Sequence, residues 1–266
     1  MRVLYIAQEI SPYLPESEIA LKCRHLPQAI QEKGKEIRTF MPRYGSINER
    51  RNQLHEVIRL SGMNLVIDDT DHPLIIKVAS IQSARMQVYF IDNEDFFHRK
   101  AVHHDDNGIF FSDNDERAIF FARGVIETVK KLRWSPDVIH CHGWISSIVP
   151  LLIKYVLKEN PLFENSKIVI SIYNDEFNSN LDKSFHKKLL NENIPHEKID
   201  HLKQEANYVS LMKTAIDASD AVIAGVTDLN THLIEYIKLI NKTFLEYQNE
   251  DCYVDSYNDL YDSLFK

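Results

Sequence analysis

Apolar runs of four to eight residues alternate with amphipathic stretches along most of the chain. The runs typical of buried strands are 3–7, 37–41, 74–81, 88–92, 138–141, 168–172 and 221–224. Helical periodicity falls between several of them, at 17–33, 114–133, 146–158 and 207–219. Strand followed by helix, repeated, predicts an α/β fold: a Rossmann-like, mostly parallel sheet with helices on both faces.

The first predicted helix shows this pattern most clearly. Its apolar positions recur at intervals of three and four residues: Ile19, Ala20, Cys23, Leu26 and Ile30. Ser17 is a good N-cap, and Pro27 should kink the helix. The helix predicted over 114–133 opens with acids and ends with bases, which suits the helix dipole.

Two regions depart from the strand and helix alternation. Residues 54–92 lack intervening helices, which predicts a hairpin or an antiparallel edge. Residues 228–245 read as one long amphipathic helix, and 247–266 form an acidic tail with an aromatic residue every fourth position from Tyr253 to Phe265. We therefore expect a domain over 1–240 and a helical tail over 241–266. The tail either packs on the body of the chain or binds a partner.

Composition and charge narrow the class of protein. The 266 residues include 31 Lys and Arg against 39 Asp and Glu, a net charge of −8, so we expect neither nucleic acid nor an anionic membrane as a partner. No apolar run approaches the roughly 18 residues of a membrane span. The start lacks the features of a signal peptide, and three separated cysteines favour a reducing compartment. These features predict a soluble cytoplasmic protein.

Candidate binding residues follow the strands, because parallel sheets place ligands beyond the carboxyl ends of their strands. Glu9 follows the first run, His142 and Trp144 the fifth, and Tyr173 and Asn174 the sixth. We expect these three loops to meet in one crevice. Trp144 and Tyr173 offer aromatic faces and Asn174 an amide to a ligand there, although core packing is an equal alternative for Trp144.

Metal and nucleophile chemistry receive little support. His140 and His142 share a face of their strand, but no third ligand is evident, so we expect no metal, and no other cofactor. A hydrogen-bonded structural role suits His140, and a ligand contact suits His142. Cys141 points to the opposite face from its neighbours. The cluster HHDD at 103–106 could hold a cation, but loop clusters of this kind are more often solvated.

Several segments resemble bacterial glycogen synthases and plant starch synthases. The start of the chain, MRVLYIAQEISPYLPESEIALKCRHLPQAI, looks like the N-terminus of that family. The similarity continues in the family's order through MPRYG (41–45), VYFID (88–92), FSDNDERAIFFARGV (111–125), WSPDVIHCHGW (134–144) and DASDAVIAGVTDL (217–229). The resemblance covers residues 1 to about 235.

The resemblance implies the N-terminal domain of a two-domain GT-B glycosyltransferase. Family members transfer glucose from ADP-glucose or UDP-glucose to the non-reducing end of an α-1,4-glucan without a metal. Their C-terminal domain supplies most of the nucleotide-sugar contacts, and we expect no counterpart of that domain in this sequence.

The first family motif is altered here. The family's Lys-Thr-Gly-Gly falls, without a gap, on Pro15, Glu16, Ser17 and Glu18. A cation and two flexible glycines are thus replaced by a proline ring and two anions. A diphosphate approaching Glu16 and Glu18 would meet like charge.

Two further family motifs lack residues that the resemblance leads one to expect. The family's His-Ala-His-Asp-Trp-His falls on 140–145, so that Gly143 and Ile145 replace the aspartate and the last histidine. Thr-x-His-Asn falls on 171–174, where Tyr173 replaces the histidine expected to contact the reacting sugar. We therefore expect no catalytic residues, that is, a pseudoenzyme.

Three functions remain open at this point. The first is a non-catalytic domain that binds an α-glucan, a nucleotide-sugar-related ligand or a regulatory protein partner. The second is one subunit of a split glycosyltransferase, completed by a separate nucleotide-binding chain that docks on the exposed inter-domain face. The third is self-association through the same face.

Overall fold

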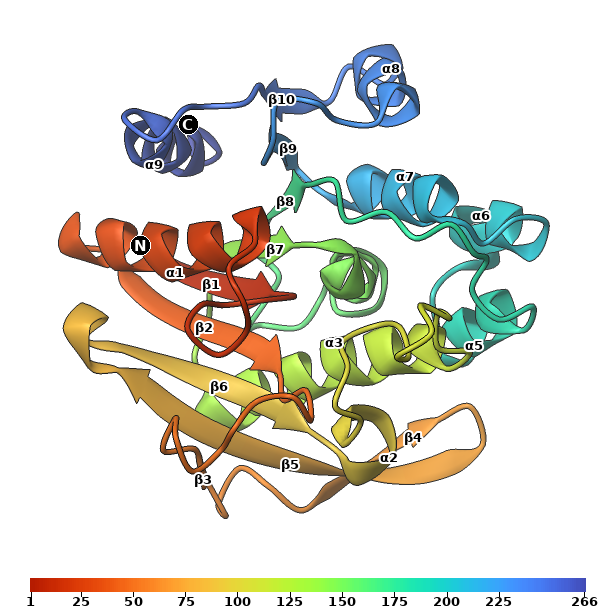
Figure 1. Cartoon of the computed structure of the whole chain (residues 1–266). Coiled ribbons are helices and arrows are strands. Elements are labelled where there is room, and N and C mark those ends of the chain that lie inside the picture. The colour runs from red at the N-terminus through yellow and green to blue at the C-terminus, as the bar shows by residue number, and fades with distance from the viewer.

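A computed structural model describes all of residues 1–266. It contains one ten-stranded sheet in the order β10-β9-β8-β7-β1-β2-β6-β5-β3, with β4 paired to β5 (Figure 1). The strands are β1 (Arg2–Ala7), β2 (Glu36–Pro42), β3 (His55–Glu56), β4 (Met63–Ile67), β5 (Thr70–Ile81), β6 (Met86–Asp92), β7 (Val138–His142), β8 (Lys167–Ile172), β9 (Ala221–Ala224) and β10 (Thr243–Leu245). The seven apolar runs all form strands, as the sequence predicts.

The sheet is parallel from β10 through β6 and antiparallel beyond it. β1 lies at its centre, between β7 and β2, in parallel register with both. β5 pairs antiparallel with β6, and β3 and β4 pair antiparallel with β5. The antiparallel edge predicted for residues 54–92 is therefore present.

Helices cover both faces of the sheet (Figure 1). They are α1 (Glu18–Glu32), α2 (Glu94–Phe97), α3 (Asn114–Leu132), α4 (Ile148–Leu151), α5 (Phe185–Asn191), α6 (His196–Ile199), α7 (Tyr208–Ala218), α8 (Thr231–Leu239) and α9 (Tyr253–Ser263). α1 and α9 pack on one face of the parallel strands in a small apolar cluster. α3, α4 and α7 pack on the other face in the main core.

The start of α1 follows from its capping residue. The Ser17 hydroxyl accepts a hydrogen bond from the Ala20 backbone N–H at 3.0 Å. Pro27 lies on the buried side, and the helix continues through it to Glu32. The apolar face predicted for this helix is the face that contacts the sheet.

The prediction of one helix over 228–245 is wrong. α8 ends at Leu239, Asn241 adopts a left-handed conformation with φ 50°, and residues Thr243–Leu245 pair with β9. Asparagine tolerates that conformation and commonly ends helices. The residues that follow then extend the sheet by one short parallel strand.

The helix predicted over 146–158 is also irregular. The chain forms a 3₁₀ turn at Trp144–Ser146, the α4 turn, and then a π-helical turn at Leu152–Val156. Pro150 lies within α4 and has no N–H to donate to the preceding turn.

α9 buries three tyrosines from its face toward the sheet. Tyr253, Tyr257 and Tyr261 lie four residues apart and are 9%, 1% and 0% exposed. The outer side of the helix carries acids, of which Asp255 pairs with Lys33 and Asp262 with Lys35 of the region after α1. Phe265, the next aromatic residue in the series, lies past the helix and is half-exposed.

The buried tyrosines predict how strongly α9 is held. Tyr257→Ala should lower the free energy of unfolding by about 3–5 kcal/mol, because it removes a fully buried ring. Phe265→Ala, the control in the same segment, should change it by about 0.5 kcal/mol or less. Urea denaturation measures both, and equally small losses would contradict the packing of α9 on the sheet.

Candidate functional site

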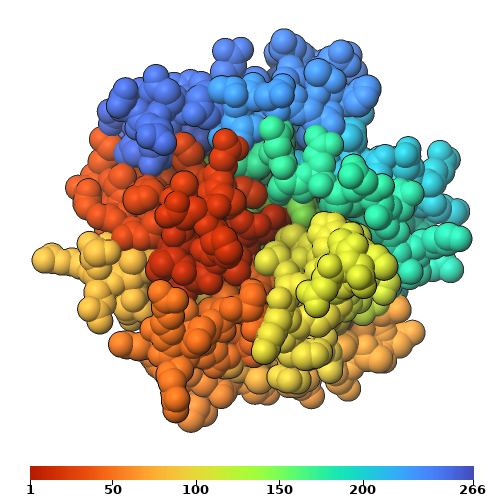
Figure 2. All heavy atoms as spheres, in the orientation of Figure 1, coloured from red at the N-terminus to blue at the C-terminus, as the bar shows by residue number.

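The loops after β1, β7 and β8 meet at the carboxyl edge of the sheet. The Gln8 N–H donates to the His142 carbonyl at 3.0 Å, and the Gln8 side-chain oxygen accepts from the Ile145 N–H at 3.2 Å. Gly143 makes this approach feasible: its φ is +83°, and a Cβ there would lie 2.7 Å from that of Gln8. Figure 2 shows atoms of the β7 region (green) recessed between the turn after β1 (red) and the segment following α2 (yellow).

Glu9 ties the turn after β1 to the start of α1. It is half-buried and accepts a 2.6 Å hydrogen bond from Ser17, the residue that caps the helix. Pro15, Glu16 and Glu18 of the same turn are exposed. The turn therefore presents carboxylates to solvent at the edge where parallel sheets place ligands.

His142 and Tyr173 are buried against each other. The Tyr173 hydroxyl is hydrogen-bonded to His142 Nδ1 at 2.8 Å, and the two side chains are 2% and 0% exposed. The Tyr173 ring lies against the backbone of Gly225, where a Cβ would come within 2.3 Å of the ring. His142 Nε2 has no hydrogen-bond partner. Burial, and secondarily the charge of Lys22, lower the pKa of His142 to about 3.

His140 lies on the same face as His142, with ring centroids 3.9 Å apart. Its Nδ1 is hydrogen-bonded to the Tyr261 hydroxyl at 2.6 Å and its Nε2 to the Ser171 hydroxyl at 2.7 Å. Burial, then the neighbouring His142, lower the pKa of His140 well below its usual value. His140 thus joins β7, β8 and α9 through hydrogen bonds of its neutral ring.

Trp144 and Asn174 lie in contrasting environments. Trp144 is buried, with its ring 4.7 Å from His103 and 5.0 Å from Phe177, centroid to centroid. Asn174 is exposed. Of the five predicted ligand contacts, His142, Trp144 and Tyr173 therefore have no accessible surface to offer in this structure. Ile145 is buried as well.

Cys141 points away from the two histidines into the core on the other face of the sheet. Burial raises the pKa of its thiol, which disfavours the reactive thiolate. No three His, Cys, Asp or Glu side chains are grouped so that they could hold a metal ion. No helix is both long enough and apolar enough to cross a membrane.

Sequence reasoning missed Asp175. Its carboxylate accepts hydrogen bonds from the Trp144 backbone N–H at 2.7 Å and from the Tyr208 hydroxyl at 2.9 Å. Burial raises its pKa to about 6, against the opposing effect of these hydrogen bonds. The sequence did contain a signal for this residue, namely an acid three residues after the end of a buried strand. Asp175 fixes the loop after β7 to the loop after β8.

The loops after β1, β7, β8 and β9 carry acids without cations. Residues 8–18, 142–147, 173–182 and 225–230 contain no Lys or Arg, and their acids are Glu9, Glu16, Glu18, Asp175, Glu176, Asp182 and Asp228. The pKa of His142 keeps that side chain neutral. These four loops therefore present a negative surface.

Comparison with known proteins places this architecture in a family. A family model described as "Starch synthase catalytic domain" matches residues 2–225. The chain belongs to the starch synthase catalytic domain family. The resemblance inferred from the sequence motifs is confirmed.

Curated members of the starch synthase family align with most of the chain. The glycogen synthase of Chlorobium luteolum is 37% identical over 220 residues, which cover 82% of this chain and 44% of that protein. The glycogen synthase of Chlorobaculum tepidum is 37% identical over 222 residues, covering 83% and 45%. The chain thus spans less than half the length of these relatives.

A solved structure has the same fold. The catalytic domain of starch synthase IV from Arabidopsis thaliana, bound to ADP and acarbose, superposes with a TM-score of 0.74 at 19% identity. The match covers 93% of this chain and 51% of that one. The predicted α/β fold of GT-B type is confirmed. Residues after 225 lie outside the family match and form α8, β10 and α9.

The buried histidines predict a pH dependence of stability. His142 has a pKa of about 3 in the folded chain and about 6.5 when unfolded. The unfolded chain therefore takes up a proton first, and stability present above about pH 6.5 falls on acidification by about 1.4 kcal/mol per pH unit for this side chain.

Urea denaturation between pH 7.5 and 5 measures this slope. His142→Gln should make the slope shallower than in the wild type by about that amount, and His25→Gln, at an exposed position, is the matched control. A slope unchanged by His142→Gln would contradict the burial of the neutral ring.

Proposed function

We propose that this member of the family binds a ligand without transferring glucose: a non-catalytic, regulatory domain whose partner is an α-glucan or another protein. The observation that carries the proposal is the buried hydrogen bond between Tyr173 and His142. By the resemblance, these positions correspond to family histidines, one of which is expected to contact the reacting sugar. In this chain the two side chains are hydrogen-bonded to each other and buried, so neither is exposed to a ligand.

The charge of the edge supports the same conclusion. A transferase must hold a nucleotide diphosphate, and cations or backbone N–H groups at flexible glycines usually do so. The turn after β1 has Glu16 and Glu18 exposed where the family's motif has a threonine and a glycine. Like charges at short distance disfavour the diphosphate.

The size of the combined loss favours inactivity over slow catalysis. Removing one preorganised hydrogen-bond donor commonly costs about 10²- to 10³-fold in rate. This chain departs from the family motifs at the Lys-Thr-Gly-Gly turn, at Gly143 and Ile145, and at Tyr173. With groups missing from all three motifs, we expect no measurable transfer.

The test is transfer of radiolabelled glucose from ADP-glucose and from UDP-glucose to glycogen by the purified protein. We expect no incorporation above a blank without protein, with the glycogen synthase of Chlorobium luteolum as the positive control. Tyr173→His should not restore activity, because the turn and the loop after β7 remain altered. Transfer by the wild-type chain would refute the proposal.

A split glycosyltransferase is the second candidate. The observation that favours it is the relatives' length, since 220 aligned residues make up only 44% of the Chlorobium luteolum enzyme. It predicts that transfer appears when the purified chain is returned to an extract of its own cells depleted of it. If the returned chain does not restore transfer, the split enzyme is refuted and the non-catalytic binding function remains.

A further inference from the structure

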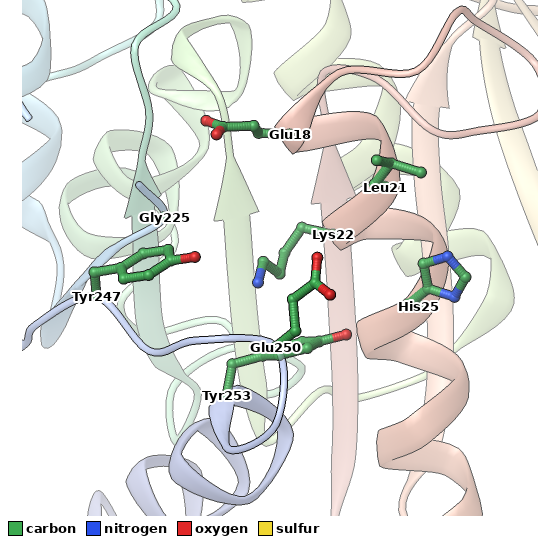
Figure 3. Close-up of a pocket in the computed structure, with 8 residues that line it drawn as sticks. All are labelled: Glu18, Leu21, Lys22, His25, Gly225, Tyr247, Glu250 and Tyr253. Carbon is green, nitrogen blue, oxygen red and sulfur yellow. The ribbon is translucent and has the colours of Figure 1, made fainter. Parts of the chain in front are cut away.

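A cavity of about 430 Å³ lies between α1 and the segment that leads from β10 into α9. Glu18 and Lys22 of α1 line one side, Tyr247, Glu250 and Tyr253 line the other, and Gly225 closes the end (Figure 3). Tyr247, Glu250 and Tyr253 lie beyond the family match, which ends at residue 225. The family's matched domain therefore supplies only part of this cavity.

Lys22 brings an uncommitted donor to the cavity. Its Nζ lies 3.6 Å from the centre of the Tyr253 ring, a cation–π contact, and no carboxylate lies within the 4.0 Å of an ion pair. Lys22 is half-buried, and burial lowers its pKa although Glu250 and Glu18 act in the opposite direction. An ammonium has three donors, and a ligand oxygen in the cavity would accept from one of them.

The opposite wall supplies acceptors and an aromatic surface. Figure 3 shows the Tyr247 hydroxyl directed toward Lys22, with the carboxylates of Glu18 and Glu250 on either side of the space. Glu18 and Glu250 are exposed and form no ion pair, and the Tyr247 ring is 38% exposed. The cavity thus combines two carboxylate acceptors, one cationic donor, the His25 imidazole and a partly accessible ring.

This lining selects a class of ligand. Two carboxylates against one ammonium repel a phosphorylated compound. A cation would compete with Lys22 for the Tyr253 ring. Hydroxyl groups both donate and accept, so a neutral polyol can bond to Glu18, Glu250 and Lys22 together, and the apolar face of a sugar ring can lie on a tyrosine. The volume lies within the range of small-molecule sites, about 300–1,000 Å³.

We propose that this cavity binds a short neutral oligosaccharide, with Tyr247 as the stacking surface, Glu18 and Glu250 as acceptors and Lys22 as donor. The proposal rests on the binding function proposed above and specifies where and how a sugar is held. The site lies beside α1 and borders the buried His142 and Tyr173 pair, because Gly225 lines the cavity and also contacts the Tyr173 ring. The C-terminal segment forms half of it.

Titration of maltotriose, followed by saturation-transfer NMR and calorimetry, tests the site on the full chain, with ADP and cellobiose as comparison ligands. Tyr247→Ala and Glu250→Gln should each weaken maltotriose binding by about 10-fold, because the first removes the stacking surface and the second replaces a charged hydrogen-bond acceptor with a weaker neutral one. Glu246→Gln, which makes the same charge change on the same segment away from the cavity, should leave the affinity unchanged. All three sites are exposed, so the variants should fold.

Each outcome decides the proposal. Maltotriose binding weakened by the two cavity variants and not by Glu246→Gln supports it. No maltotriose binding, binding indifferent to Tyr247 and Glu250, or stronger binding of ADP overturns it. Glucose transfer by the same preparations separates the two proposals, since transfer refutes the non-catalytic function whatever the titration shows, and absent binding without transfer refutes only this site.

Discussion

Two neutral imidazole rings are buried between the sheet and the elements that cover it, and the contacts around them determine how these elements fit together. His140 and His142 project from one face of β7, where water is excluded by α1, α9 and the Tyr173 ring. A charged imidazole there would be strongly disfavoured, so the rings are neutral: His140 is hydrogen-bonded to the Tyr261 and Ser171 hydroxyls, and His142 to the Tyr173 hydroxyl. This requirement joins β7, β8 and α9 into one unit.

The same constraint governs what the carboxyl edge can do. A phenol bonded to His142 and packed on Gly225 leaves no donor facing outward at that position. The neighbouring loop is held by Asp175, which bonds to the Trp144 backbone. These loops are therefore preorganised for their own internal packing, and their accessible charged groups are carboxylates. Preorganisation toward a transition state would require donors aimed at a developing charge.

The sequence predicted the sheet well and the environment of single side chains poorly. Buried parallel strands are continuous apolar runs, so runs such as 138–141 and 168–172 could be recognised as strands from the sequence. The helix prediction over 228–245 failed because amphipathic periodicity continued through Asn241, while the backbone turned there. The burial of Trp144 depends on His103 and Phe177, which are distant in sequence, and no local pattern carries that information.

NMR titration of the His142 ring nitrogens between pH 7.5 and 5.5 would show whether this ring is buried and neutral. The account predicts chemical shifts of a neutral imidazole throughout this range, because burial holds the pKa of His142 near 3. Protonation with a midpoint near the unperturbed value of about 6.5 would contradict it. That result would mean that His142 reaches solvent, and with it a ligand, at the carboxyl edge of the sheet.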